Sequence, residues 1–351
     1  MRYTTFGHRT GLRVSEYALG AANFGTRWGA GAEPDEARRV FDRFAEAGGT
    51  FLDTSDAYQF GESEELTGKF IAADRDHFVL ATKFALGASP QPDISTTGNS
   101  RKALVASVEA SLKRLGTDYI DLLWVHFPDQ LTPIEELLRG LDDLVSSGKI
   151  HHAALSNFPA WRVSRAVTLA DLKDRAPIVG IQTEYSLVER TADRELLPMA
   201  ESLGLGAALW SPLGGGLLTG KYRGGNEGRL TDLGAVIHTE STDQKTAVVD
   251  AVLTLAEETG IAPAQIAVAW VREHAARSAT TLVPIIGPRS LTQLDSYLSA
   301  LDVQLTAEQY SRLSEVSAVE LGAPHDKIAG SLGGTQGGDS SRVISPATLP
   351  A

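Results

Sequence analysis

Two helix–strand pairs follow one another in residues 100–156, SRKALVASVEASLKRLGTDYIDLLWVHFPDQLTPIEELLRGLDDLVSSGKIHHAALS. Apolar residues recur at helical spacing over Ser100–Leu115 and Pro133–Ser147, whereas Ile120–His126 and His152–Ser156 are short runs rich in apolar residues. Short strands that alternate with longer amphipathic helices are typical of β/α units, whose strands lie parallel in one sheet. This stretch therefore predicts two consecutive β/α units of an α/β fold.

The same alternation extends in both directions along the chain. It predicts further strands at Tyr17–Gly20, Phe51–Asp53, Phe78–Lys83, Ile178–Glu184, Gly206–Trp210 and Leu282–Ile286. It predicts further helices at Pro34–Ala47, Ser63–Ala72, Ala160–Ala170, Arg194–Leu203, Thr246–Glu258, Pro263–His274 and Ser290–Leu301. Eight parallel strands can close into a (β/α)8 TIM barrel, whereas an open doubly wound sheet usually has fewer strands and a G-x-G-x-x-G first turn. The first turn here, GAANFGTRWG at residues 20–29, lacks that spacing, so we predict the barrel.

Length and composition narrow the class of protein. The chain has 351 residues, a net charge of −12 and no cysteine, which excludes disulfides, thiolate metal sites and cysteine nucleophiles. The acidic balance argues against nucleic acid as a partner, because phosphate contacts need clustered lysine and arginine. The first residues lack the apolar core of a signal peptide, and no apolar run reaches membrane-spanning length. We therefore predict a cytoplasmic protein without a membrane partner, and the sequence leaves the oligomeric state open.

Three stretches interrupt the alternation. Residues 84–99 and 222–245 are long, polar segments that follow strands, so we expect them at the C-terminal face of the barrel as candidate lids. Residues 321–351 are rich in glycine and serine, which predicts a tail that is flexible or folded over the barrel mouth. No interdomain linker precedes this tail, so residues 1–320 are predicted to form a single barrel.

Polar side chains occur at or just after the ends of three neighbouring predicted strands. Asp53 and Lys83 end their strands, His126 ends the apolar run YIDLLWVH, and Tyr58 follows Asp53 by five residues. Each alone has a structural explanation: Asp53 as a turn cap, Tyr58 as a half-buried aromatic, Lys83 in solvent and His126 in the core. Because all barrel strands end at one face, the four side chains are expected together, and their coincidence favours a functional site.

These four residue types suit acid–base chemistry at a carbonyl. A tyrosine with a pKa of about 10 is a poor acid at neutral pH, but a cation beside its oxygen favours the phenolate. Asp53 could hold Lys83 in that position, and a neutral His126 could donate a hydrogen bond to an oxygen that gains negative charge. The set suits delivery of a proton to an alkoxide while a hydride arrives from elsewhere.

Several longer segments carry a family resemblance. They are LGAANFGTRWG at 19–29, AGGTFLDTSDAYQFGESEELTGKF at 47–70, VLATKF at 79–84, SLKRLGTDYIDLLWVH at 111–126, LVSSGKI at 144–150, ALSNF at 154–158, IQTEYSLVER at 181–190 and LWSPLGGGLLTGKY at 209–222. In this order they resemble the aldo-keto reductases from about residue 1 to about residue 315. The resemblance implies NADP(H)-dependent reduction of an aldehyde or ketone and an N-terminal hairpin, Arg2–Phe6 with Leu12–Val14, at the bottom of the barrel. It gives Tyr58 the role of general acid, with Asp53 and Lys83 tuning it and His126 polarising the carbonyl.

The resemblance also implies a binding groove for NADPH. In it, Ser156, Asn157 and Gln182 would hold the nicotinamide carboxamide beside Asp53, and Trp210 would stack on the nicotinamide ring. Ser211, Leu213, Gly215 and Lys221 match the pyrophosphate-binding run, and Gly287, Arg289 and Gln293 match the adenosine end. A forked contact from Arg289 to a 2′-phosphate would favour NADPH over NADH. The alternatives are a glycine-rich surface turn at 211–221 and a solvent-exposed Arg289.

The substrate side is less determined. Trp28, Phe84 and Phe127 are expected to shape a pocket together with the two long loops. Three positions depart from the family pattern: Tyr297 replaces a common asparagine at the adenine, Pro128 replaces a common tryptophan, and Ala154 replaces a glycine. None of these departures falls on the four catalytic candidates.

Two other functions remain open from the sequence. A regulatory or redox-sensing protein could bind NADPH with little turnover, and the presence of both Tyr58 and His126 argues against it. A metal-dependent barrel hydrolase needs several His and carboxylate ligands at strand ends, where the sequence offers mainly His126 and Asp53. His151 and His152 are adjacent and would face opposite ways in a strand, so no metal site is predicted.

Overall fold

A computed structural model describes residues 1–224 and 238–344 of the chain. Eight parallel strands close into a barrel in the order β10-β3-β4-β5-β6-β7-β8-β9. They are β3 (Ala18–Gly20), β4 (Phe51–Asp53), β5 (Val79–Phe84), β6 (Ile120–Val125), β7 (Ile150–Ser156), β8 (Ile178–Glu184), β9 (Gly206–Trp210) and β10 (Leu282–Ile286). Because β10 pairs with both β3 and β9, the sheet has no edge, and the predicted (β/α)8 barrel is confirmed.

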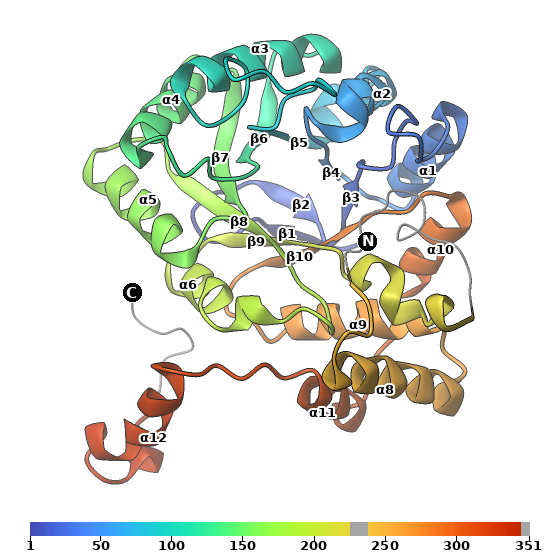
Figure 1. Cartoon of the computed structure of the whole chain (residues 1–351), viewed down its shortest axis with the longest axis vertical. Helices are drawn as coiled ribbons and strands as arrows, with labels where there is room; N and C mark the ends of the chain where they lie inside the picture. The colour runs from blue at the N-terminus through green and yellow to red at the C-terminus, as the bar shows by residue number, and fades with distance from the viewer. Residues whose placement is uncertain (225–237, 345–351) are drawn as a thin grey trace.

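Helices surround the barrel, as Figure 1 shows. They are α1 (Pro34–Glu46), α2 (Glu62–Ile71), α3 (Arg101–Leu115), α4 (Ile134–Ser146), α5 (Ala160–Leu172), α6 (Leu196–Ser202), α8 (Asp243–Thr259), α9 (Pro263–Ala275), α10 (Leu291–Ser299), α11 (Ala307–Val316) and α12 (His325–Thr335). Local signals set several boundaries: the Ser100 hydroxyl accepts the Ala103 amide at the start of α3, and Gly116 ends that helix in a left-handed conformation. None of the helices in the described ranges has the length and apolar character to cross a membrane.

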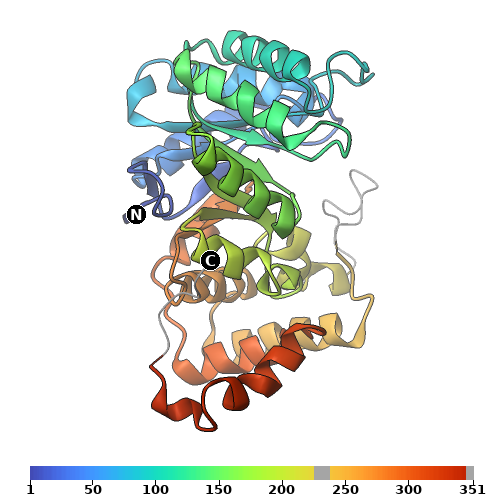
Figure 2. The same ribbon diagram turned by 90° about the vertical axis from the view of Figure 1, so that its left-hand side faces the viewer.

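A two-stranded antiparallel hairpin precedes the barrel, as the resemblance implied. Its strands, β1 (Tyr3–Thr5) and β2 (Arg13–Ser15), lie near the N-terminus, which Figure 2 shows on the left of the molecule. The buried ring of Phe6 packs edge-to-face on Phe51 and Trp124, with centroids 5.8 and 6.0 Å away. A Cβ added to Gly180 would lie 2.4 Å from this ring, so a glycine at this position of β8 leaves the space that the ring occupies. Phe6 therefore plugs the barrel.

Alternation along the strands divides the apolar core into two clusters. Residues such as Phe51, Val79, Ala81 and Trp124 pack inside the barrel with Phe6. Residues of the opposite strand faces, including Leu52 and Leu80, pack against the surrounding helices. The side chain of a strand residue thus enters either the barrel or the outer shell, and this decides which strand-end residues reach the mouth.

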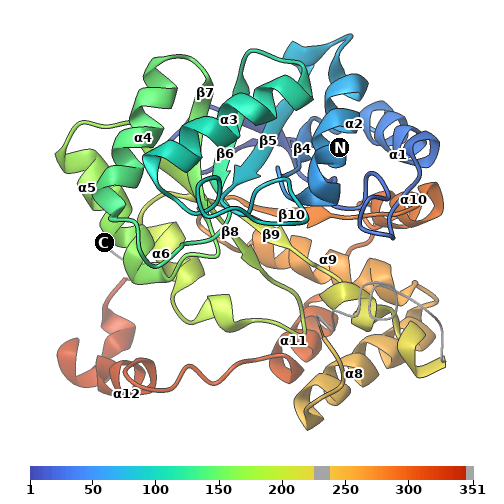
Figure 3. The same ribbon diagram turned by 45° about the horizontal axis from the view of Figure 1, so that its top comes forward.

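The C-terminal part contains two helices that the periodicity did not predict. The first, α11, packs against α8, with Leu313 fully buried. The second, α12, has no buried residue, and Figure 3 shows it outside the ring of helices. The helix lies within the glycine-rich segment 321–351, so part of that segment has regular structure. The described part of the other long stretch, 222–245, includes the start of α8 at Asp243, while 225–237 lies outside the described residues.

Phe6→Ala is expected to lower the free energy of unfolding by about 3–5 kcal/mol, because it leaves a cavity at the packed base of the barrel. Urea unfolding followed by circular dichroism measures the change. Phe127→Ala is the matched control, since its ring is 41% exposed and its loss should cost about 1 kcal/mol or less. Equal losses for the two variants would show that the hairpin does not plug the barrel.

Candidate active site

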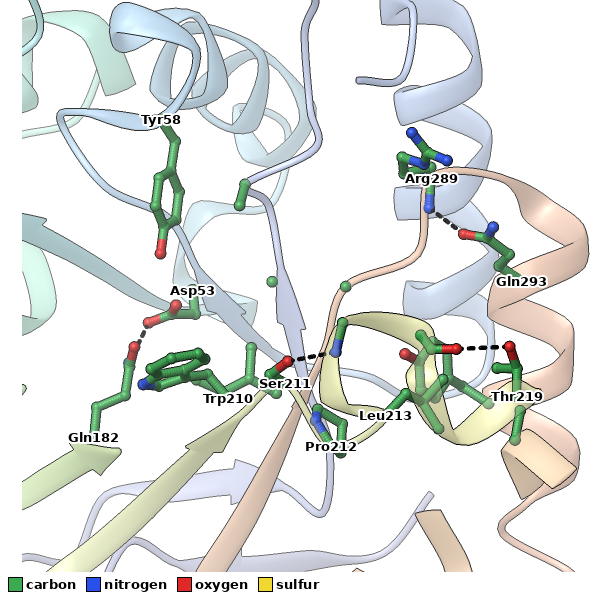
Figure 4. Close-up of a pocket in the computed structure, with 18 of the residues that line it drawn as sticks. Asp53, Tyr58, Gln182, Trp210, Ser211, Pro212, Leu213, Thr219, Arg289 and Gln293 are labelled. Atoms are coloured by element: carbon green, nitrogen blue, oxygen red, sulfur yellow. Dashed lines mark hydrogen bonds between the residues drawn. The ribbon is translucent and has the colours of Figure 1, made fainter. Parts of the chain in front are cut away.

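One cavity of about 400 Å³ opens at the C-terminal ends of the strands (Figure 4). Many of the residues singled out in the sequence line it: Asp53, Tyr58, His126, Phe127, Asn157, Gln182, Trp210, Ser211, Leu213, Gly215, Lys221, Gly287, Arg289 and Gln293. They come from strands far apart in the chain, and barrel closure brings them to one groove. The acid–base candidates therefore share one cavity with the residues proposed for the cofactor.

A buried ion pair lies beneath the cavity. Lys83 is fully buried in β5, and its Nζ lies 2.5 Å from Oδ2 of Asp53 and donates to the Thr54 carbonyl at 2.8 Å. The second oxygen of Asp53 accepts Nε2 of Gln182 at 2.9 Å. Burial alone would lower the pKa of Lys83, but the charges and hydrogen bonds of Asp53 and Tyr58 outweigh it and raise that pKa. Lys83 is therefore a fixed cation at neutral pH.

Tyr58 begins the short helix η1 (Tyr58–Gly61) after β4. Nζ of Lys83 lies 4.6 Å from the centre of the phenol ring, and a hydrogen bond from Lys83 to Tyr58 contributes to the lysine pKa. Trp28 also packs edge-to-face with the phenol, with 6.0 Å between the ring centroids. Figure 4 shows the Tyr58 hydroxyl directed toward Asp53. The phenol ring thus contacts both a cation and an aromatic side chain.

His126 follows β6 and is 7% exposed. Its ring stands at 86° to Tyr58, 5.9 Å between centroids, and stacks on Phe127 at 4.7 Å. Burial, together with the charge on Lys83, lowers the pKa of His126 well below its ordinary value. The imidazole is therefore neutral across the physiological range and can serve as a hydrogen-bond donor rather than as an acid.

The next two strands place amides beside this group. Asn157 follows β7 with φ +59°, a left-handed backbone that asparagine tolerates, and its amide donates to the His126 carbonyl at 3.1 Å and to Ser156 at 3.0 Å. Gln182 lies in β8 and holds Asp53. Ser156 itself is fully buried. These residues form the wall between His126 and the Gln182 side of the cavity.

A glycine-rich turn follows Trp210 at the end of β9. Ser211 adopts φ +60°, its hydroxyl accepts the Gly215 amide at 2.9 Å, and Gly214, Gly215 and Gly216 all have positive φ. The amides of Gly214 and Gly216 donate to the carbonyls of Ser211 and Leu213, so the turn is held together by its own hydrogen bonds. Lys221 lies at the end of the turn, where a Cβ on Gly216 would come within 3.0 Å of its Cε. Gly215, Gly216 and Lys221 thus line this part of the cavity side by side.

The far end of the cavity is formed after β10. The Arg289 amide donates to Oε1 of Gln293 at 2.8 Å, and Ser290 caps α10 by accepting the Gln293 amide. Tyr297 lines this end, at the position where the family resemblance leads us to expect asparagine. A guanidinium, an amide and a phenol therefore line this end of the cavity.

Two residues expected at the substrate side have different placements. Trp28 is half-buried and is not among the residues that line the cavity, but its ring contacts that of Tyr58, which does line it. Phe84 is instead 1% exposed and belongs to the shell between strands and helices. Because β5 sends Lys83 toward the barrel interior, the adjacent Phe84 faces the opposite way. The difference is a consequence of strand alternation.

Three further side chains near the site were not singled out in the sequence. The Ser55 hydroxyl lies between Asp56 and His126, and the first four residues of DTSDAY, Asp53 to Asp56, are all buried. Gln59, with φ +52°, accepts the Trp28 amide at 2.7 Å and donates to the carbonyls of Ala22 and Ala30. The run of polar residues in DTSDAYQ was the sequence feature that could have indicated that these residues belong to the site. Gln59 ties the loop that carries Trp28 to the segment that carries Tyr58.

The described residues contain no group of three or more histidine and acidic side chains that could hold a metal ion. In residues 1–224 and 238–344 the hydrolase interpretation therefore has no such site to support it. The described part of the cavity has a phenol beside a buried ammonium group at one end, and a glycine-rich turn, Lys221 and Arg289 farther along it, an arrangement that suits an oxidoreductase.

Comparison with known proteins agrees with this class. The chain matches the aldo/keto reductase family over residues 17–318. An uncharacterized oxidoreductase of Bacillus subtilis is 37% identical over 90% of this chain and 96% of its own. Norsolorinic acid reductase of Aspergillus flavus is 35% identical over 90% and 80%, and aryl-alcohol dehydrogenase (NADP+) of Phanerodontia chrysosporium is 34% identical over 90% and 86%. This chain belongs to the aldo/keto reductase family, whose members are oxidoreductases that generally use nicotinamide cofactors.

Gln59→Asn tests the tie between the two loops. The shorter side chain keeps an amide and tolerates a left-handed backbone, but it cannot reach all three partners. We expect the free energy of unfolding to fall by about 1–3 kcal/mol and the Trp28 amide to exchange hydrogen faster. Hydrogen exchange with mass spectrometry and urea unfolding measure both effects. Gln91→Asn on the exposed 84–99 loop is the control, and unchanged protection of Trp28 in Gln59→Asn would refute the tie.

Proposed function

We propose that this protein reduces an aldehyde or ketone to an alcohol with NADPH, and that Tyr58 donates the proton. One observation carries the proposal: Tyr58, His126 and the Lys83–Asp53 pair meet at one end of a cavity whose other end holds a glycine-rich turn and Arg289. An acid–base group and an anion-binding groove in one cavity are what a hydride-transfer enzyme with a phosphorylated cofactor requires.

The residues of the groove fit NADPH. Gly214, Gly215 and Gly216 all have positive φ, which disfavours residues with side chains, and a Cβ on Gly214 would also lie 2.5 Å from Val188. Lys221, beside this side-chain-free turn, would hold the pyrophosphate, and Trp210 would stack on the nicotinamide ring. Asn157 and Gln182, which both line the cavity, would hold the carboxamide. When bound, NADPH supplies the hydride that reduces the carbonyl carbon.

The proton comes from this chain. The Tyr58 hydroxyl donates to the carbonyl oxygen as that oxygen becomes an alkoxide, and the buried Lys83 ammonium stabilises the phenolate that remains. Asp53 keeps the ammonium in place and balances its charge in the barrel interior. Neutral His126 donates a second hydrogen bond to the same oxygen and orients the carbonyl.

The shape of the substrate side favours an aryl carbonyl. Trp28, Tyr58, His126 and Phe127 form a connected set of aromatic contacts at the mouth. Flat aromatic substrates bury well against such rings. The relatives named for aryl-alcohol and norsolorinic acid activity support the same class of substrate.

Tyr58→Phe is expected to lower kcat for carbonyl reduction by about 10²–10⁴-fold, because the general acid is lost while the ring remains. NADPH oxidation with a panel of aryl, aliphatic and sugar carbonyls measures turnover, and fluorescence titration measures NADPH binding, which should be retained. Tyr3→Phe on the distant hairpin is the matched control. Tight NADPH binding without turnover in the wild type on every carbonyl would instead favour a regulatory or redox-sensing protein, and absence of binding would end the proposal.

Arg289→Ala is expected to raise KM for NADPH by about 10- to 100-fold with little change for NADH, because a charge-assisted contact with the 2′-phosphate is lost. Initial rates with each cofactor measure the ratio. Arg13→Ala, on the exposed face of the hairpin, controls for a general loss of charge. Equal effects on the two cofactors would assign Arg289 to another part of the ligand.

A further inference from the structure

The Ser55 hydroxyl links two ionisable groups in the wall of the site. Its Oγ lies 3.3 Å from Nδ1 of His126 and 3.1 Å from Oδ1 of Asp56. It also accepts the Ala57 amide at 3.2 Å. All three side chains are buried, with Ser55 and Asp56 at most 1% exposed. The chain Asp56–Ser55–His126 therefore runs from the interior to the cavity without passing through solvent.

The number of protons in the hydrogen-bonded series Asp56–Ser55–His126 allows only two hydrogen-bonding arrangements. A serine hydroxyl has one proton to donate, so Ser55 can donate to Asp56 or to His126 but not to both. If Ser55 donates to His126, then Nδ1 is the acceptor and the ring proton of the neutral imidazole is on Nε2. If Ser55 donates to Asp56, then Nδ1 carries the ring proton and Nε2 presents a lone pair. The tautomer of His126 thus depends on which way the hydroxyl turns.

The surroundings of Asp56 favour its protonated form. Oδ2 is buried and finds no hydrogen-bond partner among the described residues, which is costly for a carboxylate. Burial and the charge of nearby Glu64 raise the pKa of Asp56 to about 7, against the opposing effects of Ser55, Arg114 and the Ala57 amide. Glu64 is itself fully buried and is paired with Arg114 at 2.7 Å. Asp56 can therefore change protonation near neutral pH without a change in that neighbouring pair.

We propose that Asp56, acting through Ser55, sets the tautomer of His126 and thereby controls whether the imidazole donates to the substrate carbonyl. When Asp56 holds its proton, it donates to Ser55, Ser55 donates to Nδ1, and Nε2–H faces the cavity. When Asp56 loses that proton to solvent, Ser55 donates to the carboxylate, the ring proton moves from Nε2 to Nδ1, and the carbonyl loses its donor. Asp56 and Ser55 are positioning residues, and the consequence for catalysis rests on the proposed carbonyl reduction.

The charge of His126 does not change in this scheme. Lys83 faces the ring from β5, and burial together with that cation keeps the imidazole neutral. The groups that face Asp56 are Glu64 of α2 and Arg114 of α3. What changes with pH is the location of one ring proton, so the readout must be sensitive to the tautomer.

Nitrogen NMR of the full-length protein, labelled with ¹⁵N-histidine and saturated with NADP+, measures the tautomer directly. The His126 signals are assigned by their loss in His126→Asn. We expect the Nε2–H form at about pH 6 and a shift toward the Nδ1–H form by about pH 8 in the wild type. Asp56→Asn, a neutral near-isostere whose amide can donate to Ser55, should keep the Nε2–H form at both pH values. Ser55→Ala should remove the dependence by breaking the chain, and Asp118→Asn, an exposed control, should behave as the wild type.

The kinetic consequence is a change in the pH profile. In the wild type, kcat for carbonyl reduction should fall as the pH rises through about 7, the pKa of Asp56, and Asp56→Asn should lack this fall. One His126 tautomer at all pH values in the wild type, or an unaltered transition in Asp56→Asn, would overturn the proposal. The NMR result does not need turnover, so failure of the proposed reductase function and failure of the tautomer control are distinguishable.

Discussion

The buried pair of Lys83 and Asp53 is the interaction on which the rest of the site depends. An ammonium in the barrel interior is costly unless it is paired and hydrogen-bonded, and here Asp53 and the Thr54 carbonyl satisfy it. Gln182 holds the other oxygen of Asp53, so three strands are joined through one carboxylate. Loss of either charge would leave the other uncompensated beneath Tyr58. The pair thus serves both the packing of the mouth and the electrostatics of the phenol.

Backbone strain is concentrated just beyond the strands. Gln59, Asn157 and Ser211 all adopt a left-handed backbone; Gln59 follows the cavity residue Tyr58, and the other two line the cavity themselves. Such conformations persist only where surrounding contacts over-determine them. Here the amide of Gln59, the amide of Asn157 and the hydroxyl of Ser211 each make such contacts. The barrel supplies rigid strand ends, and these turns aim the functional groups from them.

Much of this arrangement could be predicted from the sequence, because it follows from local periodicity. The eight strands agree with the predicted ranges within two residues, and the structure brings Asp53, Tyr58, Lys83 and His126 together as strand-end chemistry suggested. Phe84 was expected to shape the substrate pocket, but its neighbour Lys83 points into the barrel. Because successive side chains of a strand face opposite ways, Phe84 points toward the surrounding helices instead. Ser55 and Asp56 also escaped notice, because their contacts depend on β6 lying beside β5. The helix within the glycine-rich tail had no periodic signal, as no residue of α12 is buried.

The sequence by itself determined the class of fold, the number of strands and the residues at their carboxyl ends. These properties depend on alternation, helical spacing and chain order, which are local. Only the tertiary structure decided that Arg114 pairs with Glu64. It also decided that Gln59 accepts the Trp28 amide and that the Ser55 hydroxyl contacts His126. These contacts span up to about seventy residues, and their protonation depends on burial in a closed barrel. Burial is a property of the assembled molecule, so no local pattern could report it.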